Sequence, residues 1–182
     1  MEQKEAIAKL ATAAQAQGAL VVSEIGSQTV WLHDTGDHPS YLYLSGPMGM
    51  APSVVLGVAL SNPDKPVLAI CGDGALAMNF SALVTISDQA PPNLTIALMD
   101  NGVYDFTGKA PSPSQTVNWK NLVSGLSGFK SFQSISEAPI FSSNGGLAFI
   151  HAPVKPASGK AKPFPFTGPQ IYDRFLSYVQ NL

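Results

Sequence analysis

Cysteine and arginine are almost absent from this chain of 182 residues. Cys71 is the only cysteine, so no disulfide can form within the chain, which fits a reducing compartment. It lies in an apolar segment, where a buried core thiol is expected rather than a catalytic one. Arg174 is the only arginine, and the net charge of −2 argues against the clustered basic surface of a nucleic-acid-binding protein.

Charged residues and long apolar runs are also scarce. Charged side chains make up 12% of the chain, about half of their share in typical soluble domains, which predicts a domain covered on several sides by helices or by a partner subunit. The longest apolar stretch, residues 46–60, is too short and too rich in glycine and proline to span a membrane. Residues 1–5 lack the pattern of a signal peptide. We therefore expect a cytoplasmic protein that binds neither nucleic acid nor membranes.

What the sequence does contain is a regular alternation of strands and helices. The pattern predicts strands over residues 19–23, 41–44, 67–71, 94–99, 129–135 and 146–151. It predicts helices over residues 4–17, 50–60, 75–89, 118–126 and 169–182, and a short helix that begins at 136–137. Residues 31–40 are polar, and loops are predicted over 101–117 and 152–169. This alternation predicts a single three-layer α/β domain over residues 1–182, with a mostly parallel sheet and helices on both faces.

The strand predicted over residues 67–71 ends in two glycines around one carboxylate, Gly72-Asp73-Gly74. The glycines let the backbone turn sharply and approach a ligand closely. A helix follows, and its first amide groups can face an anion such as phosphate. Asp73 offers a hard oxygen ligand to Mg²⁺. Alone, this short pattern is more typical of a plain tight turn.

The next predicted strand ends in the run Asp100-Asn101-Gly102-Val103-Tyr104. Asn101 has an amide oxygen, and the glycine after it permits a bend that turns the Val103 carbonyl inward. Twenty-five residues separate Gly74 from Asp100, enough for one helix and one strand. Adjacent parallel strands would therefore bring Asp73 and Asn101 side by side. Together with the Val103 carbonyl they would supply half of an octahedral Mg²⁺ shell, which two phosphate oxygens and a water could complete.

The two motifs together resemble the signature of thiamine diphosphate (TPP) enzymes, which begins with GDG and ends with NN. Asp100 stands in place of the first Asn of that signature, as in decarboxylases of the sulfopyruvate and phosphonopyruvate type, and Asn101 matches the second, metal-binding Asn. The resemblance implies that Asp73, Asn101 and the Val103 carbonyl hold Mg²⁺. The amides that it places against the diphosphate are those of Gly74 and Ala75.

A third segment is similar to the G-x-M-G segment of the same family. It reads Ser45-Gly46-Pro47-Met48-Gly49-Met50-Ala51. In the family, a bulky apolar residue here supports the V conformation of the cofactor, and a main-chain carbonyl accepts a hydrogen bond from the aminopyrimidine amine. The matching groups are the Met48 side chain and the Gly46 carbonyl. Without the other two motifs, Met48 would be interpreted as a core side chain.

The resemblance extends over residues 18–182 and matches only the pyrophosphate-binding (PP) domain of the family. Complete TPP enzymes also need a pyrimidine-binding (PYR) domain, which supplies a glutamate to the cofactor; Glu24 does not match that glutamate. We therefore expect a subunit of a hetero-oligomer that works with a PYR-domain partner. The implied reaction is the decarboxylation of a small anionic 2-oxo acid to an aldehyde, as in the sulfopyruvate decarboxylase family. Residues 81–91 and 100–104 are similar to its β subunit, whereas Lys109-Ala110-Pro111-Ser112 replaces the usual Q-P-T.

Other interpretations stay open at this point. The chain could belong to another split TPP enzyme, similar to acetolactate synthase or to a 2-oxo acid ferredoxin oxidoreductase, or it could be a non-catalytic subunit that kept the fold. His33 and His38, beside two aspartates, could form a metal site but are more typical of a surface loop. Lys109 could attract a sulfonate or phosphonate, or face solvent. Tyr104 and Asp105 could line the cofactor cleft or the subunit boundary.

Overall fold

The computed structural model describes residues 1–136, 139–141 and 145–182. The main sheet consists of β1 (Leu20–Ser23), β2 (Tyr41–Tyr43), β3 (Val67–Gly72), β4 (Leu94–Asp100), β7 (Ser131–Ser134) and β8 (Ala148–Pro153). The helices are α1 (Gln3–Ala16), α2 (Ser27–Asp34), α3 (Ala51–Ser61), α4 (Asp73–Met78), α5 (Ser81–Gln89), α6 (Trp119–Ser124) and α7 (Gly168–Gln180). A hairpin is formed by β5 (Val103–Tyr104) and β6 (Ala110–Pro111), and a 3₁₀ helix, η1, spans Pro113–Thr116.

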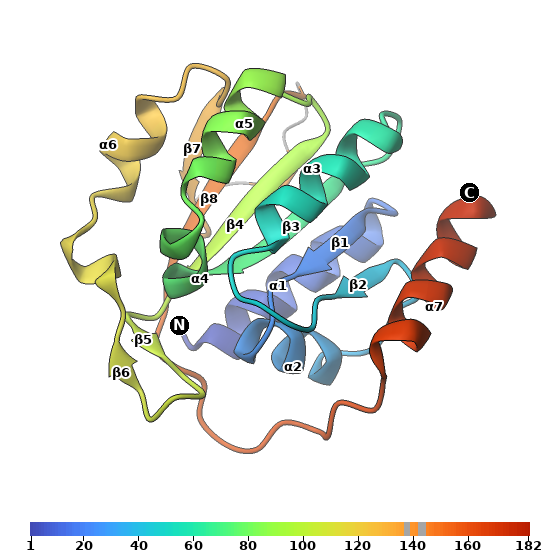
Figure 1. Cartoon of the computed structure of the whole chain (residues 1–182), viewed down its shortest axis with the longest axis horizontal. Coiled ribbons are helices and arrows are strands. Elements are labelled where there is room, and N and C mark those ends of the chain that lie inside the picture. The colour runs from blue at the N-terminus through green and yellow to red at the C-terminus, as the bar shows by residue number, and fades with distance from the viewer. Residues whose placement is uncertain (137–138, 142–144) are drawn as a thin grey trace.

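The main sheet has the order β2-β1-β3-β4-β8-β7, and the pairings described between its strands are parallel. The central strands β3 and β4 run side by side with Gly72 opposite Met99 (Figure 1). Residues 67–71 and 94–99 are buried throughout, as expected for strands that are covered on both faces. The predicted parallel α/β sheet is confirmed.

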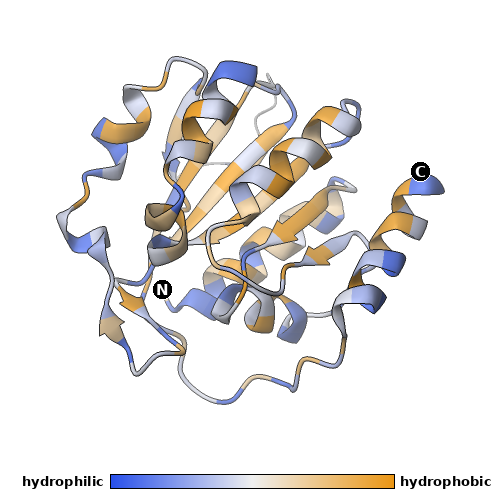
Figure 2. Cartoon of the chain, viewed as in Figure 1, coloured by the Kyte–Doolittle hydropathy of each residue, from blue (hydrophilic) through white to orange (hydrophobic). Residues whose placement is uncertain are grey.

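Helices cover both faces of this sheet. α1 and α2 pack on one face, against Leu68 and Ile70 among others. α3, α4, α5 and α6 pack on the other face, against Val67, Ala69 and Cys71. Because successive strand residues point to opposite faces, β3 contributes to both cores, and Figure 2 shows the apolar residues concentrated on the strands and on the helix faces turned toward them. The Cys71 thiol is a core group, and its burial raises its pKa.

The single helix predicted over residues 75–89 is two helices, α4 and α5. Asn79 interrupts the helical backbone with φ −131° and ψ 47°. Its side-chain Nδ2 donates a hydrogen bond of 2.8 Å to the carbonyl of Gly49. Side chains that bond main-chain groups in this way compete with the helix. The break consequently ties the end of α4 to the loop that precedes α3.

Three further predictions need correction or lie outside the described residues. Residues 27–34 form α2, although residues 31–40 have no apolar helical pattern, because part of the helix is buried through polar side chains. These buried polar residues are Ser27, Gln28 and Thr29. The loop predicted over residues 101–117 contains the β5–β6 hairpin and η1. The short helix predicted from 136–137 runs into residues 137–138, which lie outside the described part of the chain.

Residues 154–167 connect β8 to α7 and run across the molecule toward β2 (Figure 1). Phe164 and Phe166 pack against His33 and Tyr43, with ring centroids 5.0–6.5 Å apart. We call these four side chains the aromatic cluster. His33 therefore belongs to a packed group of rings rather than to a metal site. Among the residues that the structure describes, no helix combines the length and the apolar character needed to cross a membrane.

Candidate functional site

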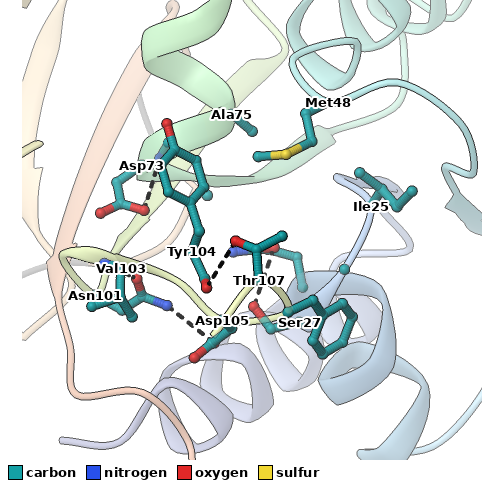
Figure 3. A pocket seen from close by; sticks show the side chains of 15 residues that line it. Ile25, Ser27, Met48, Asp73, Ala75, Asn101, Val103, Tyr104, Asp105 and Thr107 are labelled. Carbon is teal, nitrogen blue, oxygen red and sulfur yellow. Dashed lines mark hydrogen bonds between the residues drawn. The ribbon is translucent and has the colours of Figure 1, made fainter. Parts of the chain in front are cut away.

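A pocket opens at the carboxyl ends of β1, β3 and β4, the edge at which parallel α/β sheets bind ligands. Its wall is built from residues 25–28 after β1, Met48 before α3, residues 72–75 at the start of α4, and Asn101 with residues 103–107 after β4 (Figure 3). The structure thus brings together every residue predicted to bind the cofactor except Gly46. That residue lies two positions before Met48, is exposed, and has φ +116°.

Asp73 lies at the floor of this pocket and is 3% exposed. Its Oδ2 accepts hydrogen bonds from Ser112 Oγ at 2.6 Å and from the backbone N–H of Gly102 at 2.8 Å. Its Oδ1 accepts one from the N–H of Gly74 at 2.8 Å. Burial raises the pKa of Asp73, and these three hydrogen bonds oppose that rise. The carboxylate is therefore held in one orientation and also fastens the loop that follows β4.

Asn101 lies next to Asp73, as the sequence spacing predicts for two adjacent parallel strands. Its Nδ2 donates to Gln3 Oε1 at 2.9 Å and to Asp105 Oδ2 at 3.2 Å. Its Oδ1 accepts a hydrogen bond of 2.9 Å from the backbone N–H of Val103. The amide is thereby oriented with its oxygen on the side of Val103.

Asp100, the residue that departs from the NN signature, makes its side-chain contacts outside the pocket wall. One of its oxygens accepts a 2.6 Å hydrogen bond from Ser114 Oγ, and the other lies 2.8 Å from His151 Nε2. Burial alone would raise the pKa of Asp100, but the contacts with His151 and Ser114 outweigh it and lower the pKa. Ser114 also accepts a hydrogen bond from Trp119 Nε1. Asp100 thus anchors the segment leading into α6.

The two glycines of the Gly72-Asp73-Gly74 motif allow neighbouring side chains to approach the backbone. A Cβ atom at Gly72 would lie 2.6 Å from Gln28 Nε2, and one at Gly74 would lie 2.2 Å from the Tyr104 ring. No side chain larger than hydrogen fits at either position without a shift of these neighbours. The glycines thus admit the close approach of the Gln28 and Tyr104 side chains, and the approach of a ligand stays a prediction.

The loop that carries Met48 is held from beneath by Glu24, which is 1% exposed. Glu24 Oε2 accepts hydrogen bonds from the backbone N–H groups of Gly49 at 3.1 Å and Ala51 at 3.3 Å. Burial raises the pKa of Glu24, and its bonds to backbone N–H groups oppose the rise. Met48 is 40% exposed, and its side chain points into the pocket towards Ala75 (Figure 3).

Several residues of the site were not found by sequence analysis. Ser27 and Gln28 line the pocket, and Ser112 holds Asp73. Ser27 and Gln28 could have been found from the sequence, because they follow a predicted strand at the edge where ligands bind. Conversely, Lys109 is an exposed residue with φ +58° in the β5–β6 hairpin and is not part of the pocket wall.

The charges and lone pairs of the pocket favour a hard cation. Asp73 and Asp105 contribute carboxylates, and no Lys, Arg or His occurs among the described residues of the wall. In the described structure, Asp73 Oδ1 and Asn101 Oδ1 each accept a single hydrogen bond, so each keeps a lone pair. Carboxylate, amide and carbonyl oxygens are the ligands that Mg²⁺ prefers. No group of three or more His, Cys, Asp or Glu able to hold a metal occurs in the described parts of the chain. Of the two histidines considered from the sequence, His33 packs against Phe164 and His38 Nδ1 lies 2.8 Å from Ser40 Oγ.

The fold and the pocket define an α/β protein with a ligand site at the carboxyl edge of its sheet, built from glycines and hard oxygen donors. The family model for the thiamine pyrophosphate enzyme C-terminal TPP binding domain matches residues 24–145. The chain belongs to this family, and the resemblance noted from the sequence is confirmed.

Relatives extend the match to nearly the whole chain. The chain is 31% identical to the sulfopyruvate decarboxylase β subunit of Methanothermobacter thermautotrophicus, over 89% of this chain and 88% of that protein. It is 32% identical to the phosphonopyruvate decarboxylase of Streptomyces viridochromogenes over 88% of this chain, but spans only 42% of that protein. The fold is similar to that of a chain from Mycobacterium smegmatis assigned as a thiamin diphosphate-dependent enzyme, with a TM-score of 0.67 and 19% identity over 86% of this chain and 32% of that one.

Proposed function

We propose that this chain, as a single PP domain, is the TPP- and Mg²⁺-binding subunit of a heteromeric 2-oxo acid decarboxylase. The observation that carries the proposal is the convergence of Asp73, Asn101 and Val103 on one pocket whose floor is the Gly72-Asp73-Gly74 motif. Relatives that match nearly the whole chain are named as decarboxylase β subunits, which supports the reaction class and the division into subunits.

The oxygen donors and glycines of the pocket fit the metal and the diphosphate. Asp73, the Asn101 amide oxygen and the Val103 carbonyl would hold Mg²⁺. The diphosphate would lie against the backbone near Gly72, beside the Gln28 side chain that approaches this glycine, and against the amides that begin α4. Those amides belong to Gly74 and Ala75, and Tyr104 stands beside them as a further wall of the cofactor site. Because no basic side chain lines the described wall, the metal and the backbone amides are the groups that neutralise the phosphates.

Met48 and the Gly46 carbonyl would position the cofactor, and Glu24 supports the loop that carries them. TPP, when bound, supplies the electron sink that makes loss of CO₂ from a 2-oxo acid possible. Met48 would support the bend between its two rings, and the Gly46 carbonyl would accept a hydrogen bond from its amine. Glu24 holds the backbone that follows Met48 through buried hydrogen bonds to the N–H groups of Gly49 and Ala51.

A PYR-domain partner would complete the site. The pocket encloses about 210 Å³, less than the roughly 300–1,000 Å³ of most small-molecule sites. No glutamate is among the described residues of its wall, and Glu24 is occupied by the backbone amides of Gly49 and Ala51. The proposal therefore assigns the catalytic glutamate, and much of the remaining enclosure, to the partner.

The proposed substrate is a small anionic 2-oxo acid of the sulfopyruvate type. The test is co-expression with the PYR-type chain encoded nearest to this one, followed by assay with sulfopyruvate, TPP and Mg²⁺. We expect one CO₂ and one aldehyde for each substrate consumed, and no turnover with Asp73→Ala. Formation of acetolactate or of an acyl-CoA from pyruvate as the main product would contradict the reaction. Turnover by the chain without any other polypeptide would contradict the need for a partner.

A further inference from the structure

Gln3 is a buried polar residue at the start of α1, far in sequence from the motifs that line the pocket. The residue is 0% exposed, which is unusual for glutamine, and both ends of its amide are used. Gln3 Nε2 donates to Ser27 Oγ at 2.9 Å, and Gln3 Oε1 accepts from Asn101 Nδ2 at 2.9 Å. Ser27 and Asn101 both line the pocket. Gln3 therefore joins the segment after β1 to the loop after β4.

The contact with Gln3 helps to decide which way the Asn101 amide faces. The oxygen and the NH₂ group of an amide have nearly the same shape, so their hydrogen-bond partners set the orientation. Gln3 Oε1 and Asp105 Oδ2 are acceptor oxygens, and both contact Asn101 Nδ2. The amide oxygen is left on the opposite side, where it accepts a bond from Val103 N–H.

Gln3 is the firmer of the two acceptors. Its contact with Asn101 Nδ2 is 2.9 Å long, against 3.2 Å for Asp105. The backbone of Gln3 is also fixed, because its N–H donates to the carbonyl of Lys155 at 2.9 Å. Asp105 lies in the exposed turn of the β5–β6 hairpin and is only half-buried. Loss of Gln3 would thus leave Asn101 with a more distant and less rigidly held partner.

We propose that Gln3 is a positioning residue of the metal site, which holds the amide oxygen of Asn101 toward the cation. The inference rests on the proposed function, because it takes Asn101 as a metal ligand. A cation needs the oxygen of an amide and is repelled by its NH₂ group. Residues that orient a metal ligand typically change metal affinity by about 10–100-fold when they are removed.

The test is titration with Mn²⁺ in place of Mg²⁺, followed by electron paramagnetic resonance, on the assembled enzyme with saturating TPP. Gln3→Leu removes both hydrogen bonds, and we expect Mn²⁺ to bind about 10–100-fold more weakly. Gln3→Glu keeps an acceptor oxygen toward Asn101 and should bind Mn²⁺ more tightly than Gln3→Leu. The readout is the metal itself, so it does not depend on turnover.

Asn93 provides a matched control at the opposite end of the sheet. Its Nδ2 donates to three carbonyls, those of Ala59, Asn62 and Lys65. Asn93→Leu should therefore lower the unfolding temperature while the Mn²⁺ affinity stays unchanged. A merely structural role for Gln3 predicts the same behaviour for Gln3→Leu.

A folded Gln3→Leu variant that binds Mn²⁺ within about twofold of the wild type overturns the inference, given the effect expected for a ligand-orienting group. If that variant does not fold, Gln3→Asn carries the same test: its amide is one methylene short of Asn101, and the same weakening is expected. Wild-type protein that binds no TPP with Mg²⁺ or Mn²⁺ overturns the proposed function. Normal binding by the wild type and by the Gln3 variants overturns the role of Gln3 alone.

Discussion

The pocket edge of the sheet and the aromatic cluster beside β2 are held together in different ways. At the pocket, buried carboxylates accept hydrogen bonds from the loops around them, as Asp73 does from Ser112 and Gly102. At the aromatic cluster, Phe164 and Phe166 are held by ring packing, with Arg174 4.1 Å above the Phe166 ring. Hydrogen bonds fix individual atoms in direction, whereas packing mainly excludes water.

The contacts at the pocket and those at the aromatic cluster therefore have different consequences, the first for ligand binding and the second for stability. The oxygen atoms of Asp73 and Asn101 are oriented by at least two partners on each side chain. In the aromatic cluster, Phe164 and Phe166 are held mainly by ring packing, and the one hydroxyl, that of Tyr43, donates a hydrogen bond of 2.9 Å to Asp37 Oδ1. We therefore expect substitutions at the pocket to alter cofactor binding and substitutions at the cluster to alter the free energy of unfolding.

The largest effect is expected at Asp73. Asp73→Ala removes the anionic oxygen donor that faces the proposed metal, and TPP affinity in the presence of Mg²⁺ should fall by at least about 100-fold, or roughly 3 kcal/mol. Calorimetric titration of the assembled enzyme measures it, with circular dichroism to confirm folding. Removal of Mg²⁺ by a chelator should weaken TPP binding to the wild type in the same way. Unchanged TPP affinity in the folded variant would refute the metal assignment.

The second-largest effect is expected in the aromatic cluster. Phe164→Ala removes one ring from the aromatic cluster and should lower the free energy of unfolding by about 2 kcal/mol, less than a fully buried Phe would cost because Phe164 is only partly buried. Urea denaturation measures the loss. TPP affinity should stay the same, and a drop as large as that of Asp73→Ala would erase the distinction between the two regions.

The sequence predicted the central strands and the pocket motifs for the same reason. Strands buried on both faces are continuous apolar runs, and the segments that leave them must turn at one edge of the sheet. Gly72-Asp73-Gly74 and Asp100-Asn101 could therefore be placed together before any contact was known. The glycines and oxygen donors of these motifs lie at the edge of the sheet where the parallel strands end.

The supporting contacts could not be predicted because they join distant parts of the chain. Gln3 meets Asn101 across 98 residues, and Ser112 meets Asp73 across 39. Gln3 stands outside the motifs, and Ser112 lies in the segment that departs from the family's Q-P-T, so only the tertiary arrangement shows their role. The helix α2 was missed for a related reason: its burial depends on hydrogen-bonded polar groups such as Ser27 rather than on an apolar stripe.

A third prediction concerns Met48, whose side chain points into the pocket. Met48→Ala removes the proposed support for the bent cofactor and should slow hydrogen exchange at the reactive carbon of TPP by about tenfold, or 1.4 kcal/mol. TPP affinity should change little, because the diphosphate is held elsewhere. Met48→Leu conserves volume and should retain most of the rate. Equal exchange rates in the wild type and Met48→Ala would contradict a supporting role for Met48.

The smallest effect is a pH dependence at Glu24. Burial raises the pKa of Glu24 in the folded protein, so the folded state binds this proton more tightly than the unfolded state. The associated stability is complete below the unfolded pKa and is lost as pH rises through the folded pKa. Relative to Glu24→Gln, which cannot titrate, the wild type should lose stability as pH rises above the ordinary glutamate pKa of about 4.3. Urea denaturation at several pH values measures this difference. A difference in stability between the wild type and Glu24→Gln that does not change with pH would contradict a raised pKa of Glu24.

The most direct test of the account is a crystal structure of the assembled enzyme with TPP and Mg²⁺. The account predicts one Mg²⁺ bound by the Asp73 carboxylate, the Asn101 amide oxygen and the Val103 carbonyl, with the diphosphate against Gly72 and the amides that begin α4. A metal bound elsewhere, or TPP held without these groups, would contradict it.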